Sequence, residues 1–280
     1  MRRPFAAAFC TPNHRSSHYR TPALDLWYPP SMRFMRRWPA PTVVIGLVGL
    51  GFASVAIAVD LRVYYPLAFG TTRIYQIERH SMTDVGNERS EALGEGRLHE
   101  EVVGLSKLSN ARRSVYKVRE RIEFRGGGPF TLIDADIVYH VSVRENLVLL
   151  HAVNEDVYAS PSVVLSDPAI LFSEVPSFLI EGEDPLRASV GIISQTIESV
   201  TVPAGKFRKA IKQVFEGSLD GELDGQTLRD GAIREITWYA KRVGAVQRVK
   251  HRYFRLLSPE GIETVHSDTT ILKLTSFSTP

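Results

Sequence analysis

Cysteine is almost absent from this chain: the only one among its 280 residues is Cys10. It precedes an apolar run at 42–59, so the rest of the chain after that run contains none. This excludes intramolecular disulfides, cysteine-ligated zinc and a thiol nucleophile from that part of the chain. Cys10 has too few apolar residues before it for a signal-type h-region, so we expect no lipidation there.

An excess of positive charge is also missing from the body of the chain. Residues 1–58 carry seven of the 34 Lys and Arg residues and one of the 31 acids, Asp25, which leaves 27 basic and 30 acidic residues in 59–280. The basic pI therefore belongs to the N-terminal part. Because nucleic-acid binding requires clustered Lys and Arg against phosphate, we expect no nucleic-acid partner.

The sequence also lacks the common catalytic and phosphate-binding motifs. None of the patterns Gly-x-Ser-x-Gly, Gly-x-x-x-x-Gly-Lys-Ser/Thr, His-Glu-x-x-His or Gly-x-Gly-x-x-Gly occurs. The six histidines after residue 60 are dispersed along the chain. We therefore predict no catalytic residue, no metal site and no cofactor.

Two acidic stretches come closest to a site. Residues 220–231 begin like a calcium loop, but Glu222 occupies the third position and Gly231 the twelfth, where a bidentate Glu is expected. This stretch is typical of a solvated hairpin loop. Asp134 and Asp136 would share one face of a strand, and we interpret them as outward-facing polar residues.

The N-terminal part contains the most specific signal, the apolar run Thr42–Val59. As a helix its 18 residues would extend about 27 Å, close to the thickness of a bilayer core. Arg33, Arg36 and Arg37 precede it. Three interpretations remain open: a signal sequence cleaved after Ala58, an uncleaved membrane anchor, or a buried core helix. The first two place the body outside the cytoplasm, in the periplasm or another extracytoplasmic space, because the basic flank stays inside.

These features predict three segments. Residues 1–37 form a disordered basic segment, in which translation could instead start at Met32 or Met35. Residues 38–59 are the signal sequence or anchor, through which the protein would contact the membrane. Residues 60–280 form an exported β-rich domain.

The body has the period-two hydrophobicity of strands separated by short breaks. Residues 114–124 alternate cleanly, with Glu120 as the exception on the apolar face. Residues 199–207, SVTVPAGKF, predict a tight hairpin, since Pro203 fixes φ and Gly205 allows φ > 0. The expected strands are at 72–80, 96–107, 114–124, 130–144, 145–153, 190–202, 206–217, 232–242, 244–257 and 262–277. The fold class is therefore mainly β: a single curved antiparallel sheet, a half-barrel or open barrel of meander topology, after one N-terminal hydrophobic helix.

Residues 159–189 differ, because four prolines interrupt apolar residues. Since Pro disrupts strand and helix interiors, we predict an irregular stretch here. Its apolar side chains could line a ligand pocket or fill the core beneath a long connection. The candidate ligand-binding residues are Leu165, Ile170, Leu171, Phe172, Phe178 and Leu179.

Three segments, at 64–79, 200–213 and 238–250, resemble a family of exported bacterial β-rich proteins that is similar to the LolA/LolB-type lipoprotein-carrier half-barrel. The matching residues are Tyr64, Pro66, Leu67, Gly70, Tyr75, Val202, Pro203, Ala204, Gly205, Phe207, Trp238, Tyr239, Ala240, Val243 and Gly244. Arg73 stands where the family has an aromatic residue, and Lys241-Arg242 replaces Pro-Gly. The resemblance implies a curved antiparallel sheet that wraps an apolar cavity.

The leading functional hypothesis is a non-enzymatic exported cell-envelope protein that binds an apolar ligand, a lipid or a lipoprotein within the curved sheet. The alternative is a structural or assembly component of the envelope that acts through protein contacts. An enzyme is the third hypothesis, and it would require His and acidic residues converging in one pocket. The sequence does not specify the oligomeric state.

Overall fold

The computed structural model describes residues 60–109, 111–126, 135–166, 173–177, 186–223 and 226–280. All of them belong to the second of two units into which the chain divides, Val55–Pro280. The predicted segment 1–37 and the apolar run Thr42–Val59 lie outside the described residues. Within the described ranges, the one α-helix is α1 (Leu61–Tyr64), and no helix there has the length or hydropathy to span a bilayer.

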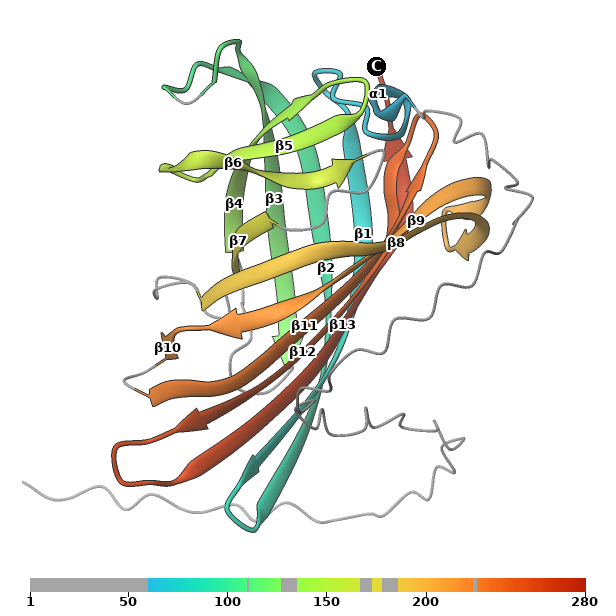
Figure 1. The fold of residues 1–280 in the computed structure, drawn as a ribbon. Helices are drawn as coiled ribbons and strands as arrows, with labels where there is room; N and C mark the ends of the chain where they lie inside the picture. Colours follow the sequence, from blue (N-terminus) through green and yellow to red (C-terminus); the bar gives the residue numbers. More distant parts are fainter. Residues whose placement is uncertain (1–59, 110, 127–134, 167–172, 178–185, 224–225) are drawn as a thin grey trace, which may run out of the picture. The chain divides into compact units, whose positions relative to one another are not determined.

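Thirteen strands form one sheet, and every strand pairing in the described residues is antiparallel (Figure 1). The strands are β1 (Thr72–Val85), β2 (Glu88–Ser106), β3 (Val115–Gly126), β4 (Ala135–Val143), β5 (Leu147–Val153), β6 (Asp156–Ser166), β7 (Ser173–Ser177), β8 (Leu186–Val202), β9 (Gly205–Asp220), β10 (Glu222–Leu223), β11 (Gln226–Ala240), β12 (Gly244–Leu257) and β13 (Glu263–Ser278). Their order is β6-β5-β4-β3-β2-β1-β13-β12-β11-β9-β8-β7, with β10 paired to β11. The predicted fold class, a mainly β protein with one curved antiparallel sheet forming a half-barrel, is confirmed.

Burial alternates along the strands and defines a concave and a convex face. On β1, Tyr75 and Ile77 are buried while Gln76 and His80 are exposed. Apolar side chains of the concave face from distant strands form the core, as in the cluster that joins Tyr75 to Leu98 and Leu272. The sheet thus buries its core by curling on itself, without a second layer of helices among the described residues.

The hairpin predicted at 199–207 is confirmed. Val202 ends β8 and pairs with Gly205, which begins β9 with a φ of 134°. The backbone N–H of Ala204 donates to the carbonyl of Leu274 (3.0 Å), so the turn is fixed against β13. Other strands are longer than predicted: β1 and β2 extend to the turn at 86–87, beyond the predicted strands at 72–80 and 96–107.

The prediction of an irregular stretch over 159–189 is wrong for its described parts. Residues up to Ser166 continue β6, and Ser173–Ser177 form β7. Pro161 lies in a bulge of β6, between its pairings through Val157 and Ser162. Both strands are at the ends of the sheet, and an edge strand tolerates proline because one of its two sides has no hydrogen-bonded neighbour. Parts of β6 and β7 approach within 8 Å between Cα atoms, although no described ladder joins them.

Candidate functional site

A cavity of about 220 Å³ lies inside the curve of the sheet. Side chains from both ends of the sheet line it: Val163 of β6 and Leu150 of β5 from one end, Val190 of β8 and Phe215 of β9 from the other. The curl of the sheet is therefore what creates the cavity. Its apolar lining consists of Val118, Val141, Leu150, Val163, Val164, Val190, Phe215 and Ile233.

Five charged side chains line the same cavity and form what we call the charged floor: Glu100, Glu120, Glu235, Arg248 and Lys250. They lie on β2, β3, β11 and β12, at positions whose strand neighbours point to the convex face. Three tyrosines complete the lining: Tyr65, Tyr139 and Tyr239. The cavity is therefore amphipathic, with charges and hydroxyls on one part of its surface and aliphatic groups on another.

Glu100 is neutralised by Arg73, whose guanidinium donates to its carboxylate. Both side chains are buried, and Arg73 also donates to the carbonyls of Pro66 (2.8 Å) and Val243. The arginine that departs from the family pattern thus ties β1 to β2, to the segment before β1 and to the turn after β11. Gly244 makes room for it, since a Cβ there would lie 2.9 Å from the Arg73 Nε.

Glu120 has a less balanced environment. It stands directly opposite Glu100 in the β2–β3 ladder, where like charges destabilise a sheet. Its carboxylate accepts a hydrogen bond from the Tyr139 hydroxyl. Burial raises the pKa of Glu120 to about 7, with Arg248 opposing the shift and Glu100 adding to it. Near neutral pH this side chain therefore exchanges between its neutral and ionised forms.

Glu235, Arg248 and Lys250 form the other half of the charged floor. The Arg248 Nε lies 3.4 Å from the Glu235 carboxylate, which also accepts from the Thr237 hydroxyl (3.1 Å). Lys250 is the cross-strand partner of Glu235, and burial lowers the pKa of this lysine although Glu235 opposes the shift. Arg248 and Glu235 keep 31% and 25% of their side-chain surface accessible, because they face the cavity.

The charge balance follows from these contacts. With Arg73 paired to Glu100, the remaining groups are two carboxylates, Glu120 and Glu235, and two cations, Arg248 and Lys250. Protonation of Glu120 leaves one positive charge in excess. The cavity can therefore accept a single anionic group, such as a carboxylate or a phosphate, beside apolar chains.

A second buried ionic cluster lies further along the concave face. Asp268 of β13 contacts Arg252 (3.0 Å), Arg79 (3.4 Å) and His266 (3.6 Å), and His266 also contacts the Thr83 hydroxyl (2.9 Å). Although burial alone would raise it, these partners hold the pKa of Asp268 well below its usual range. Asp268 thus binds two arginines, and the cluster joins β1, β12 and β13.

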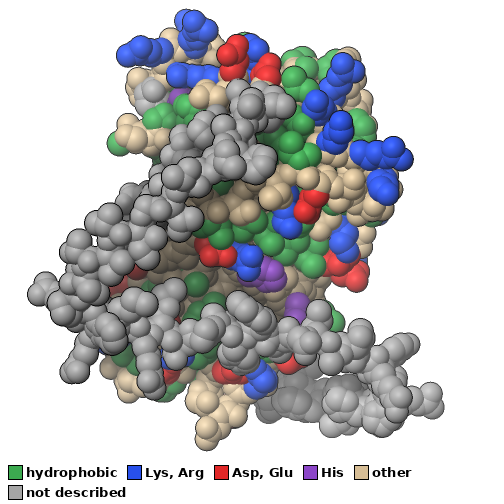
Figure 2. Space-filling view, turned by 45° about the vertical axis from the view of Figure 1, so that its right-hand side comes forward, with side chains coloured by type: hydrophobic (Ala, Val, Ile, Leu, Met, Phe, Trp, Pro, Cys, Tyr) green, Lys and Arg blue, Asp and Glu red, His purple; other side chains and the backbone are tan. Residues whose placement is uncertain are grey.

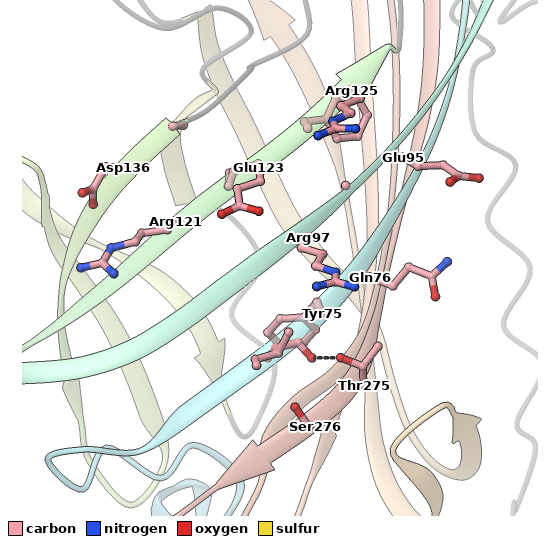
Figure 3. A pocket seen from close by; sticks show the side chains of 15 residues that line it. Tyr75, Gln76, Glu95, Arg97, Arg121, Glu123, Arg125, Asp136, Thr275 and Ser276 are labelled. Atoms are coloured by element: carbon pink, nitrogen blue, oxygen red, sulfur yellow. Dashed lines mark hydrogen bonds between the residues drawn. The ribbon is translucent and has the colours of Figure 1, made fainter.

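A larger and more open hollow, of about 1390 Å³, involves the convex face of β1, β2 and β3 (Figure 3). Arg97, Arg121 and Arg125 project there together with Glu95 and Glu123. These side chains are exposed and of both signs, so water screens their charges. Figure 2 likewise shows acidic and basic side chains interspersed with hydrophobic ones. The cavity inside the curve is the better candidate site.

Of the six predicted ligand-binding residues, Leu165 is described. It is fully buried in the core beside Val102 and Val148, while its neighbours Val163 and Val164 line the cavity. Ile170, Leu171, Phe172, Phe178 and Leu179 lie outside the described residues. Asp136 is exposed and bonded to Arg119 (2.8 Å), as expected for an outward-facing residue, and Asp134 is not described. The described residues contain no group of three His, Cys or acidic side chains placed to hold a metal.

The charged floor was not predicted, although the sequence contains two signals for it. Glu120 interrupts the apolar face of 114–124, and Arg248, Lys250 and Arg252 recur at every second position of β12. A polar face is normally assigned to solvent. Here it points into the curve, and only the curl of the sheet reveals this.

No protein-family model matches this chain, and no curated protein matches it. Two solved structures resemble it: a candidate lipoprotein from Parabacteroides distasonis (12% identity, TM-score 0.37) and a candidate exported protein with a YmcC-like fold from Bacteroides fragilis (16% identity, TM-score 0.33). Each alignment covers 77% of this chain and 98% of the other protein. Likeness at this level carries no argument about function.

Proposed function

We propose that this protein is a non-catalytic, exported cell-envelope protein that binds an anionic amphiphile, a lipid or the acylated part of a lipoprotein, inside its curved sheet. The observation that carries the proposal is the amphipathic cavity. Its aliphatic lining suits an acyl chain, and Arg248 and Lys250 of the charged floor suit a carboxylate or a phosphate. Cofactor and ligand sites commonly combine an apolar lining with a few convergent polar groups in this way.

The size of the cavity restricts the ligand. Pockets that enclose a whole drug-sized ligand measure roughly 300–1,000 Å³, whereas this one measures about 220 Å³. It would hold a polar group and the first methylenes of a chain, with the rest of the ligand extending between the ends of the sheet.

Two features of the sequence support export and lipid handling. The apolar run Thr42–Val59 after three arginines is typical of a signal sequence or anchor. The three matching segments resemble the exported family that is similar to LolA/LolB-type carriers. In the structure these segments meet: the Tyr75 hydroxyl donates to the Ala245 carbonyl (2.8 Å), and Tyr239 pairs with Ile211 across the β9–β11 ladder.

A fluorescent fatty acid, cis-parinaric acid, tests the proposal. We expect its emission to rise on binding the full chain, and native mass spectrometry to show lipid carried through purification. Val163→Trp, which fills the cavity, should weaken binding by about tenfold or more, because the chain loses its apolar contact. Val157→Trp, on an exposed site of the same strand, should leave binding unchanged.

Equal binding by both variants, or no binding at all, would defeat the proposal. A bare chain in the mass spectrum, together with an envelope protein recovered by crosslinking, would instead support the structural or assembly role. The two outcomes differ in whether any small molecule accompanies the protein.

A second candidate function, hydrolysis with an acidic side chain as proton donor, is favoured by Glu120 alone. A carboxyl with a pKa of about 7 in a cavity suits general acid catalysis. No histidine is among the residues that line the described cavity, however. Hydrolysis of parinaric esters that is lost in Glu120→Gln, with binding retained, would replace the binding proposal with this one.

A further inference from the structure

One end of the sheet combines exposed apolar side chains with basic turns. Phe69 precedes β1 and is 71% exposed, Leu105 near the end of β2 is 62% exposed, and Val63 of α1 is 37% exposed. Exposed apolar side chains also occur toward the opposite end, where Leu93 is 76% and Ile262 is 53% exposed, so it is their combination with charge that distinguishes the α1 end.

Hydrogen bonds place the turns of this end together. The Leu61 N–H of α1 donates to the carbonyl of Glu145 in the β4–β5 turn (2.7 Å), and the Arg242 N–H of the β11–β12 turn donates to Val63 (2.7 Å). The Gly70 N–H donates to Val102 of β2 (2.9 Å), which joins the segment containing Phe69 to the strand containing Leu105. Figure 1 shows α1 and the C-terminus at this same end.

The charge of this end is strongly positive. The exposed basic residues of its turns are Lys107, Arg112, Arg113, Arg144, Lys241 and Arg242. The described acids of these turns, Asp60 and Glu145, both contact Arg62 (2.8 and 3.3 Å). The opposite end is mixed in charge, because Glu88, Asp220, Glu222 and Glu260 are exposed in or beside its turns together with Arg89, Arg125 and Arg229.

We propose that the α1 end of the sheet, through Phe69, Leu105 and its basic turns, docks on a bilayer surface that contains anionic phospholipid. Charge complementarity selects anionic headgroups, and the apolar side chains reach the interface beneath them. The position of the chain favours a membrane over a protein partner: α1 begins at Leu61, two residues after the apolar run Thr42–Val59 ends. This docking would hold the body against the membrane, and it does not depend on the cavity.

Spin labels on the full chain in nanodiscs test the docking. Cys10→Ser removes the only cysteine, after which Phe69→Cys and Leu105→Cys carry a nitroxide at the proposed surface. Leu93→Cys, at a 76% exposed position of β2 toward the opposite end, is the control. In discs rich in phosphatidylglycerol we expect the labels at 69 and 105 to be accessible to oxygen, which concentrates in the bilayer, and inaccessible to a water-soluble nickel complex. The label at 93 should be more accessible to the nickel complex than to oxygen.

Charge reversal provides the second measurement. Arg112→Glu/Arg113→Glu should reduce the docked fraction about tenfold or more, because each basic residue near an anionic surface contributes measurably to binding. Arg121→Glu/Arg125→Glu makes the same charge change on exposed sites of β3 and should have no effect.

Nickel accessibility at 69 and 105 equal to that at 93, in anionic discs, would overturn the proposal. Equal effects of the two double variants would also overturn it. Parinaric acid binding is unaffected in either case, so this test is separate from that of the cavity.

Discussion

Glu120 is a single residue that lowers the stability of the fold at neutral pH. It is buried on the concave face and stands opposite Glu100 across the β2–β3 ladder. A carboxyl whose pKa is raised by burial binds its proton more tightly in the folded state than in the unfolded state. Stability therefore falls as pH rises from about 4.5 to about 7, the pKa that this residue has in the fold.

Replacement of Glu120 by glutamine should remove this cost. At pH 8 we expect Glu120→Gln to raise the free energy of unfolding by about 1–3 kcal/mol, since ionisation no longer opposes folding. Below about pH 4, where the carboxyl is protonated in both states, the two proteins should be equally stable. Urea unfolding at several pH values measures this, and Glu123→Gln, exposed on the opposite face of the same strand, is the control. If Glu120→Gln is less stable than the parent at pH 8, the prediction is wrong, because the ionised Glu120 carboxylate would then stabilise the fold.

The same residue should make ligand binding depend on pH. Ionised Glu120 lies beside the cations proposed to hold an anionic headgroup, so it opposes that charge. We expect parinaric acid to bind up to about tenfold more tightly at pH 6 than at pH 8, as the carboxyl becomes neutral. In Glu120→Gln the affinity should be constant over this range. Affinity that rises with pH in the parent would contradict the assigned charge balance.

Gly244 shows a different constraint at the residue scale. It has a φ of 96°, and a Cβ would press on the Arg73 guanidinium. Gly244→Ala should lower the free energy of unfolding by about 2–4 kcal/mol, through both backbone strain and displacement of a buried ion pair. Gly70→Ala is a matched control, since Gly70 also has a positive φ (81°) but open space around it. It should cost about 1 kcal/mol. Equal losses on thermal unfolding would show that Arg73 adjusts without cost.

At the scale of the element, β9 contains a bulge that its sequence does not favour. The β8–β9 register shifts between Glu198 and Val200, and Lys209 on the partner strand has a φ of 60°. A non-glycine residue in this conformation costs roughly 1–2 kcal/mol. The bulge increases the bend of β9 near the turn that contacts β13.

Lys209→Gly should therefore stabilise the protein by about 0.5–1 kcal/mol, because the relief of backbone strain at the positive φ exceeds the extra backbone entropy that glycine loses on folding. Lys206→Gly, in the same strand and without a positive φ, should destabilise it by a similar amount. Differential scanning calorimetry of both variants measures the opposite signs. Destabilisation by Lys209→Gly would mean that the lysine side chain contributes more than the backbone costs.

At the scale of the whole described unit, the sheet has two ends, β6 and β7, and each contains a proline. Pro161 lies in the bulge of β6, and Pro176 pairs with Arg187 in β7. Because proline has no N–H to donate, it blunts an edge that could otherwise pair with another chain. The prolines thus oppose association through the edges of the sheet.

Restoring the two backbone N–H groups that the prolines lack should promote association of chains through the sheet edges. We expect Pro161→Thr/Pro176→Thr to form dimers or larger species whose fraction increases with concentration, as measured by size-exclusion chromatography with light scattering. Pro259→Thr, in the β12–β13 turn, should leave the distribution unchanged. A double variant with the distribution of the parent would show that other features protect these edges.

The sequence alone determined the class of this fold, because alternation of apolar residues every two positions permits little except strands, and short polar breaks permit little except antiparallel hairpins. It also located the 203–204 turn, since proline and glycine restrict backbone angles locally. The sequence analysis misjudged β6 and β7, because whether proline is tolerated depends on a strand's place at the edge of the sheet.

The sequence analysis placed the candidate ligand residues at 165–179, whereas the described cavity brings together Glu100, Glu120, Glu235, Arg248 and Lys250. Only the tertiary structure decided which residues line the cavity, because the curl of the sheet determines which face of each strand is enclosed. That curl depends on contacts between residues more than 100 positions apart, such as that of Arg73 with Val243.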